Sequence, residues 1–170
     1  MEILADIIDK INRLIGKSVA WLALFMVLMQ FIVVVMRYVF GVGSIFMQES
    51  IIYMHAMLFM FGAGYTLLRD GHVRVDVFYR EAKPRHKAKI NLFGALVFMI
   101  PVLLTIWFIS WGYVADSWQV MEGSKETSGI HAVYLLKSVI LVFCAVMLLQ
   151  AISMILRAVS VLSQPATLGK

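Results

Sequence analysis

The sequence predicts an all-α integral membrane protein with four transmembrane helices and both termini in the cytoplasm, forming a single membrane domain over residues 1–170. Hydrophobic residues make up 62% of the chain and charged residues only 15%, whereas a soluble domain carries about 25% charged residues. A chain this short has too few polar residues to cover so much apolar surface in water. Lipid is therefore the solvent that the composition favours.

Four runs without a charged residue identify the spans: 18–36, 50–68, 91–115 and 138–156. A helix needs about 20 residues to cross the ~30 Å of hydrocarbon in a bilayer. With their apolar flanks, the predicted transmembrane helices cover 18–40, 50–68, 91–114 and 132–156. Four buried helices of a soluble protein are the alternative. We disfavour it because no run has a polar stripe that would face water.

The positive charges predict the orientation. Of the 15 lysines and arginines, only Arg37, Lys125 and Lys137 lie outside the N-terminal segment, the 69–90 loop and the 157–170 tail. The positive-inside rule therefore places both termini and this loop in the cytoplasm. Anionic phospholipids account for the net charge of +5, so nucleic acid is not needed to explain it.

Residues 2–17 predict an amphipathic helix. Ile3, Ile7 and Leu14 recur at helical spacing, and charged residues such as Asp6 and Arg13 occupy the opposite face. The segment is too short and too charged to cross a bilayer, so it lies in the cytoplasmic interface or packs against a partner subunit. The first span is expected to be retained, because no small-residue cleavage site follows it.

The 69–90 loop is expected to have two parts. Gly71 stands where the second span should stop. Val73 and Val77 belong to a run that alternates apolar and charged residues, which is the period of an extended segment. Pro84 then suits the first turn of a new helix. The loop is expected to be basic and cytoplasmic, and the loops of the chain are too short to hold an enzyme outside the bilayer.

The third span contains Pro101, which predicts a kink. An aromatic belt marks its outer end, formed by Trp107, Trp111, Tyr113 and Trp118. A loop rich in acidic and small residues follows. The lone Cys144 cannot form an intrachain disulfide, so a four-helix thiol oxidoreductase is excluded.

Charged residues at the outer ends of the spans have two interpretations each. Arg37 and Glu49 flank the first hairpin, and we favour a salt bridge between them over independent contact with water. Lys137 lies inside the fourth span. For Lys137 we favour snorkelling outward over pairing with Glu122 or Glu126.

No Asp or Glu lies at the middle of any predicted span, which argues against a self-sufficient small multidrug exporter. His55 and His131 match in depth, but no motif supports a haem between them. Gly62, Gly64 and Thr66 predict a close-packed seam inside the bundle. The residues suggest no nucleophile, metal site or cofactor, so an enzyme is not expected.

Four motifs in order carry a resemblance to a known family: R-Y-x-F from Arg37, an acidic residue at Glu49, a small stretch at 62–64, and R-x-G-H-V-R-V-D-V over 69–77. The chain resembles the small membrane subunit, the DctQ-type protein, of tripartite ATP-independent periplasmic (TRAP) transporters. It departs from the family in having one carboxylate, not two, before the second span. It also lacks a proline in 129–134.

The resemblance implies a subunit of a sodium-driven importer of organic acids in the bacterial cytoplasmic membrane. Its partners would be a large DctM-type membrane subunit, which holds the substrate and sodium sites, and a periplasmic binding protein. The expected interface residues are Arg37, Glu49, Arg69, His72, Arg74, Asp76, Glu122, Glu126 and Lys137, and Arg85, Lys87 and Lys89 are expected to contact lipid headgroups. A haem- or quinone-bearing anchor subunit and a self-associating exporter are the alternatives.

Overall fold

The structure, a computed structural model, describes residues 2–72, 79 and 81–163, and these form helices joined by short loops without strands. The elements are α1 (Glu2–Val39), α2 (Ile45–Leu68), α3 (Pro84–Phe93), the π-helix η1 (Gly94–Met99), α4 (Ile100–Gln119) and α5 (Val133–Ser163). Since α3, η1 and α4 run on as one helix, four helices are long and apolar enough to cross a membrane. The all-helical, four-span prediction is confirmed.

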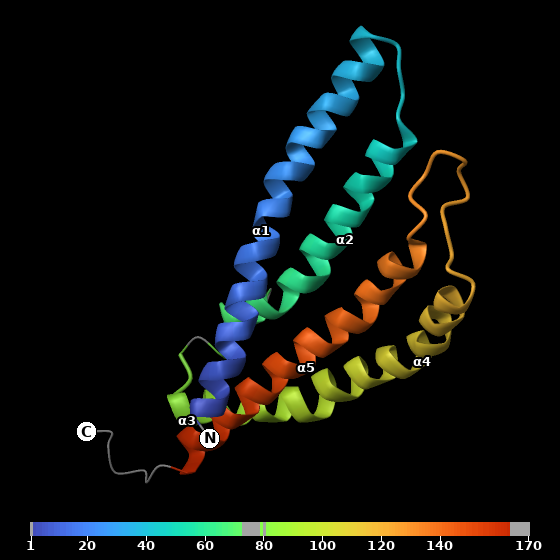
Figure 1. The fold of residues 1–170 in the computed structure, drawn as a ribbon. Helices are drawn as coiled ribbons and strands as arrows, with labels where there is room; N and C mark the ends of the chain where they lie inside the picture. Colours follow the sequence, from blue (N-terminus) through green and yellow to red (C-terminus); the bar gives the residue numbers. More distant parts are fainter. Residues whose placement is uncertain (1, 73–78, 80, 164–170) are drawn as a thin grey trace.

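Helix α5 is the centre of the bundle. Among the described helices, it is the one that contacts all of the others, whereas α1 contacts α2 and α5. The helices converge where α1 begins and α5 ends, and they spread apart toward the two hairpin loops (Figure 1). In the most apolar stretch of α5, 39% of the residues are buried, against 11% or less in the other spans. Few residues of the remaining spans are fully buried.

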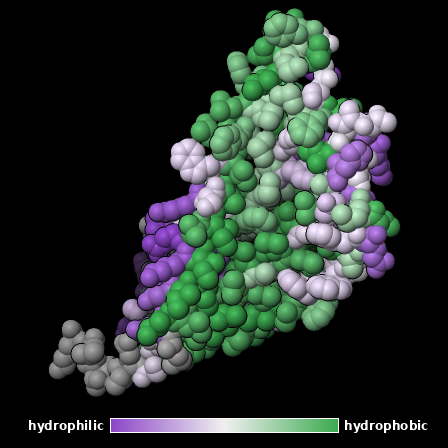
Figure 2. Space-filling model, viewed as in Figure 1, coloured by the Kyte–Doolittle hydropathy of each residue, from purple (hydrophilic) through white to green (hydrophobic). Residues whose placement is uncertain are grey.

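The apolar core lies where α5 meets α2 and α4. Leu103, Cys144 and Met147 form its buried cluster, with Ala63 and Leu67 of α2 packed against it. Large side chains such as Phe59, Phe108 and Ile109 are instead more than 70% exposed. Hydrophobic surface covers most of the face seen in Figure 2, and hydrophilic residues gather at two edges. This exterior suits lipid or an apolar partner.

The predicted amphipathic segment is the first half of α1, because the helix runs unbroken from Glu2 into the span. Its buried side carries Asp9 and Asn12 together with Ala5 and Ile8. Its apolar stripe is exposed: Ile3, Leu4, Ile7, Ile11 and Leu14. The face turned into the bundle is therefore mixed in polarity, and Asp9 and Asn12 find partners there, whereas the other charged residues of this segment stay exposed.

Helix α2 begins at Ile45, before the expected residue 50, because the Oγ atom of Ser44 accepts a hydrogen bond from the Met47 N–H. It ends in a Schellman motif, in which the Gly71 N–H bonds to the Thr66 carbonyl at 2.8 Å. The left-handed residue of this motif is Asp70 (φ 54°), one position before the expected Gly71. Gly71 follows it as the second residue beyond the cap.

Pro101 stands directly after the wide π turn of η1. A proline inside a helix clashes with the carbonyl four residues earlier and donates no hydrogen bond. Here the Ile100 N–H reaches back five residues, to the carbonyl of Ala95. The wider π turn accommodates the proline ring, so the helix continues from Pro84 to Gln119 as one candidate span.

Candidate functional site

Two clusters of polar side chains connect the helices at the two ends of the bundle. The first, which we term the loop cluster, consists of Glu49, Ser117, Glu122, Ser124 and Lys137. Glu49 extends from the second turn of α2 to the loop between α4 and α5. Its carboxylate accepts hydrogen bonds from the Ser124 hydroxyl and, at 2.6 Å, from the Ile130 N–H. The α4–α5 loop is thereby tied to the start of α2.

Glu122 and Lys137 form the second half of the loop cluster. Their ion pair has an Nζ–Oε2 distance of 2.5 Å, and the Ser117 hydroxyl donates to the same carboxylate oxygen at 2.7 Å. Hydrogen bonds from Lys137 and then from Ser117 lower the pKa of Glu122. The lysine Nζ also lies 3.9 Å from the centroid of the Tyr113 ring. The interpretation that Lys137 snorkels outward was therefore wrong, since it pairs with Glu122.

Two glycines allow the α4–α5 loop to fold this tightly. A Cβ atom at Gly129 would lie less than 3.0 Å from Ser124 and Glu49, and one at Gly123 would lie 2.6 Å from Nδ1 of His131. Between them the loop presents an exposed tip: Lys125, Glu126, Thr127 and Ser128. Glu126 bonds to the loop through its backbone N–H, which donates to Ser124, and its side chain is free to meet a partner.

The expected ion pair between Arg37 and Glu49 is not present. Both residues lie in the described part of the chain, yet the Glu49 carboxylate is bonded to the α4–α5 loop. Arg37 is exposed in the last turn of α1, where a cation suits the negative end of the helix dipole. It lines a groove of about 410 Å³ with Gln30 and Gln48.

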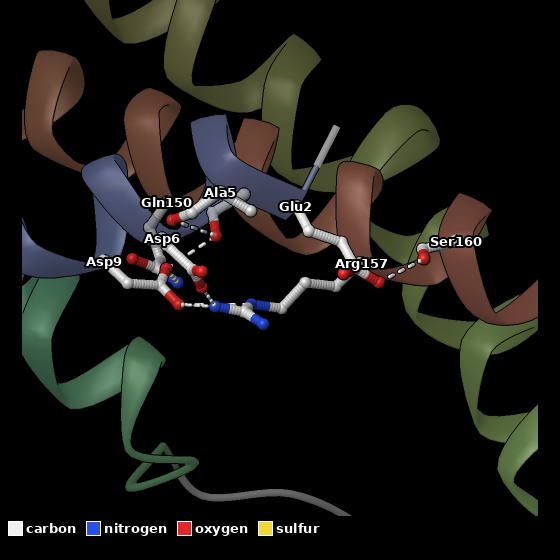
Figure 3. A network of polar contacts seen from close by, with 8 residues as sticks. Glu2, Ala5, Asp6, Asp9, Gln150, Arg157 and Ser160 are labelled. Carbon is white, nitrogen blue, oxygen red and sulfur yellow. Dashed lines mark hydrogen bonds and ion pairs between the residues drawn. The ribbon is translucent and has the colours of Figure 1, made fainter.

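The second polar cluster, which we term the terminal cluster, consists of Asp6, Asp9, Asn12, Gln150, Ser153 and Arg157. Figure 3 shows the Arg157 guanidinium of α5 pointing at the carboxylates of Asp9 and Asp6 on α1. Its Nε lies 3.1 Å from Asp9 and its Nη2 lies 2.9 Å from Asp6. Ser153 donates a 2.5 Å hydrogen bond to Asp9. The two chain ends are joined by this cluster.

The terminal cluster differs from a surface ion pair because most of its side chains are buried. Asp9 is 5% exposed, and Asn12, Gln150 and Ser153 are 2% exposed or less. The Asn12 side-chain amide donates to Gln150 at 2.7 Å. Sequence reasoning missed this site, although Gln150, Ser153 and Arg157 share one helical face through their spacing of three and four. Such a polar stripe at the end of an otherwise apolar span was the available signal.

The described residues of the middle loop belong to neither cluster. Arg69 caps α2, with its N–H donating to the Tyr65 carbonyl at 3.0 Å, and His72 is exposed. Arg74 and Asp76, with the expected extended segment around them, lie outside the described residues. All of the interface assignments stay predictions, since contacts within the chain do not test contact with a partner.

The three residues expected at lipid headgroups lie on α3. Arg85 donates from Nη2 to the Leu162 carbonyl at 3.1 Å, and Lys87 places its Nζ 5.2 Å from the Tyr79 ring centroid. Lys89 is exposed. Arg85 and Lys87 thus contact other parts of the chain, and Lys89 points outward.

The histidines considered for haem have other neighbours. His55 stacks on Phe59 with a ring-centroid distance of 6.2 Å. His131 lies against Gly123. In the ranges that the structure describes, no group of three or more His, Cys, Asp or Glu residues is placed to hold a metal ion.

A comparison with protein families identifies what the chain is similar to. A family model described as the DctQ component of tripartite ATP-independent periplasmic transporters matches residues 26–161. It covers the whole loop cluster and Arg157, and it begins after the α1 residues of the terminal cluster. Neither a curated protein nor a solved structure matches the chain.

Proposed function

The chain belongs to the family of DctQ components of TRAP transporters, and on this basis we propose that it scaffolds the large membrane subunit and helps to dock the periplasmic binding protein. The transporter would import an organic acid together with sodium. Family membership carries the proposal, since it places the chain in a tripartite complex with a larger membrane subunit and a periplasmic binding protein.

The exposed apolar surface supports the scaffolding role. α1 and α4 keep most of their large apolar side chains exposed, with Phe31 at 67% and Phe108 at 72%, and α2 adds a few, such as Phe59 at 71%. Only α5 is substantially enclosed. A chain arranged in this way has broad faces to offer a membrane partner, whose helices would pack on it by close van der Waals contact.

The proposed orientation follows the basic residues. The bundle end that carries α3 and the terminal cluster would face the cytoplasm, with Lys89 at the anionic headgroups. The α4–α5 loop would then face the periplasm, where a binding protein can reach it. Tethering of this loop to Glu49 supports the docking role, because a loop held in one conformation costs less entropy to bind.

Co-purification tests the scaffolding role. When the chain is co-expressed with the large membrane subunit of its transporter, the two are expected to elute together in mild detergent and to restore uptake with the binding protein. Cells that lack the chain should contain less of the large subunit. Recovery of a folded chain alone, with an unaffected and active large subunit, would contradict the proposal.

Charge reversal at the loop tip tests the docking role. Lys125→Glu combined with Glu126→Lys is expected to lower uptake several-fold while membrane expression stays constant, because both exposed side chains would meet the binding protein at the rim of an interface. The control is Glu81→Lys, an exposed residue at the opposite end of the bundle. Uptake that responds to Glu81→Lys and not to the loop variant would reject both the docking site and the orientation.

A further inference from the structure

A groove of mixed polarity runs along the outside of the α1–α2 hairpin. Gln30 and Arg37 of α1 and Gln48 of α2 line it, and all three are exposed. Seven residues, or about two helical turns, separate Gln30 from Arg37, so Gln30 lies on the same side of α1 and ~10 Å further from its end. The groove therefore carries hydrogen-bonding groups deep into the predicted first span.

Three hydroxyl side chains on the outer faces of α2 and α4 form hydrogen bonds within their own helices. Ser50 donates to the Phe46 carbonyl, Thr66 to the Gly62 carbonyl and Thr105 to the Pro101 carbonyl, each within its own helix. In the described part of the chain, the side chains of Gln30 and Gln48 make no such bond. Hydrocarbon offers no partner to an exposed amide, so Gln30 needs one from another protein.

We propose that this groove receives a transmembrane helix of the large membrane subunit, one that carries a carboxylate against Arg37 and a hydrogen-bonding side chain two turns away against Gln30. The inference rests on the proposed function and adds to it which face of the chain meets the partner. Charge complementarity favours a carboxylate, because Arg37 has no ion pair among the described residues.

A lipid or a second copy fits the groove less well. A phosphate headgroup could reach Arg37 by its position at the helix end, but it would leave Gln30 in hydrocarbon. A second copy would have to offer a carboxylate near this end of a span. The described helices supply Glu49, which is already bonded, and Asp116. Two helical turns further into the span from Glu49 and Asp116 lie Ala56 and Ile109. Their side chains cannot form a hydrogen bond with the Gln30 amide.

Photocrosslinking in the assembled complex tests the face. A benzoylphenylalanine in place of Val34, which lines the groove, is expected to yield an adduct with the large subunit. The same residue in place of Ile109, exposed on α4, is the matched control and should yield lipid adducts only. An adduct from Ile109 and none from Val34 would overturn the proposed face while leaving the proposed function intact. An adduct between two copies of the chain at Val34 would overturn the choice of partner.

Substitution of the polar residues gives an independent readout. Gln30→Leu and Arg37→Gln are each expected to reduce the large subunit retained after detergent washing about three- to tenfold, the range for hydrogen bonds between membrane helices. Thr105→Val removes a self-satisfied hydroxyl from the outer face and should leave retention unchanged. If Gln30→Leu and Arg37→Gln retain as much of the large subunit as Thr105→Val does, the proposal is overturned. If the unaltered chain itself fails to retain the large subunit, the proposed function fails as well.

Discussion

Arg157→Ala is expected to loosen α1 from α5 and to raise the labelling rate of Cys144 at least tenfold. The substitution leaves the Asp9 carboxylate, 5% exposed, without its guanidinium partner. Removing one member of a buried ion pair costs about 3–5 kcal/mol, and we expect the lower end because the arginine side chain is 49% exposed. Each 1.4 kcal/mol corresponds to about a factor of ten in an opening equilibrium.

Cys144 reports this loosening through the opening of the whole bundle, because its buried neighbours lie on α2, α4 and α5 and not on α1. It is the only cysteine of the chain and is fully buried in the core of α5. A thiol-reactive dye therefore labels it only when the bundle opens. The assay uses the purified complex, and the chain is separated from its partners on a denaturing gel before its fluorescence is read.

Two further variants test whether a higher labelling rate comes from the unpaired buried charge or from the loss of any arginine. Arg85→Ala removes an exposed arginine from the same end of the bundle, where it donates to the Leu162 carbonyl, and should change the rate little. Asp9→Asn in the Arg157→Ala background removes the stranded charge and should restore part of the protection. If Arg157→Ala behaves like Arg85→Ala, the terminal cluster does not stabilise the bundle.

The spans were predictable because hydropathy and length depend only on local sequence. Asp9 and Arg157 are 148 positions apart, and no local pattern links them. Glu122 and Lys137 are 15 positions apart across one loop, so their pairing could at least be considered from the sequence. The Glu49 contacts could not, because the α4–α5 loop reaches α2 only after the bundle has formed.

The first half of α1 illustrates a second limit of sequence reasoning. Periodicity showed that Ile7 and Leu14 share a face with other apolar residues, but it could not show whether that face points inward. In water the apolar face must be buried. In lipid both faces of a bundle can be apolar, and the polar face is the one that gains from enclosure. Asp9 and Asn12 are buried for this reason.

Gly16→Ala is expected to destabilise the junction of α1 and α2 and to raise the labelling rate of Cys144 about tenfold or more. A Cβ atom at Gly16 would lie less than 3.0 Å from the Cβ and Cγ atoms of Tyr65. Because the Tyr65 Cβ is fixed to its backbone, no change of rotamer relieves the clash, and the helices must move apart. Overpacking of this kind costs about 1–3 kcal/mol or more.

Two glycines of α2 provide the graded comparison. Gly64 and Gly62 were expected to share one packing seam, but only Gly64 is buried, and its added Cβ would lie 2.5 Å from Cγ1 of Val146. Gly64→Ala should therefore destabilise the bundle, and Val146→Ala in the same chain should restore part of the loss by removing the clashing methyl group. Gly62→Ala meets only Val19 at 4.0 Å and should be neutral or slightly stabilising, because alanine favours a helix over glycine. Equal labelling rates for Gly16→Ala, Gly64→Ala and Gly62→Ala would show that these close approaches do not hold the helices together.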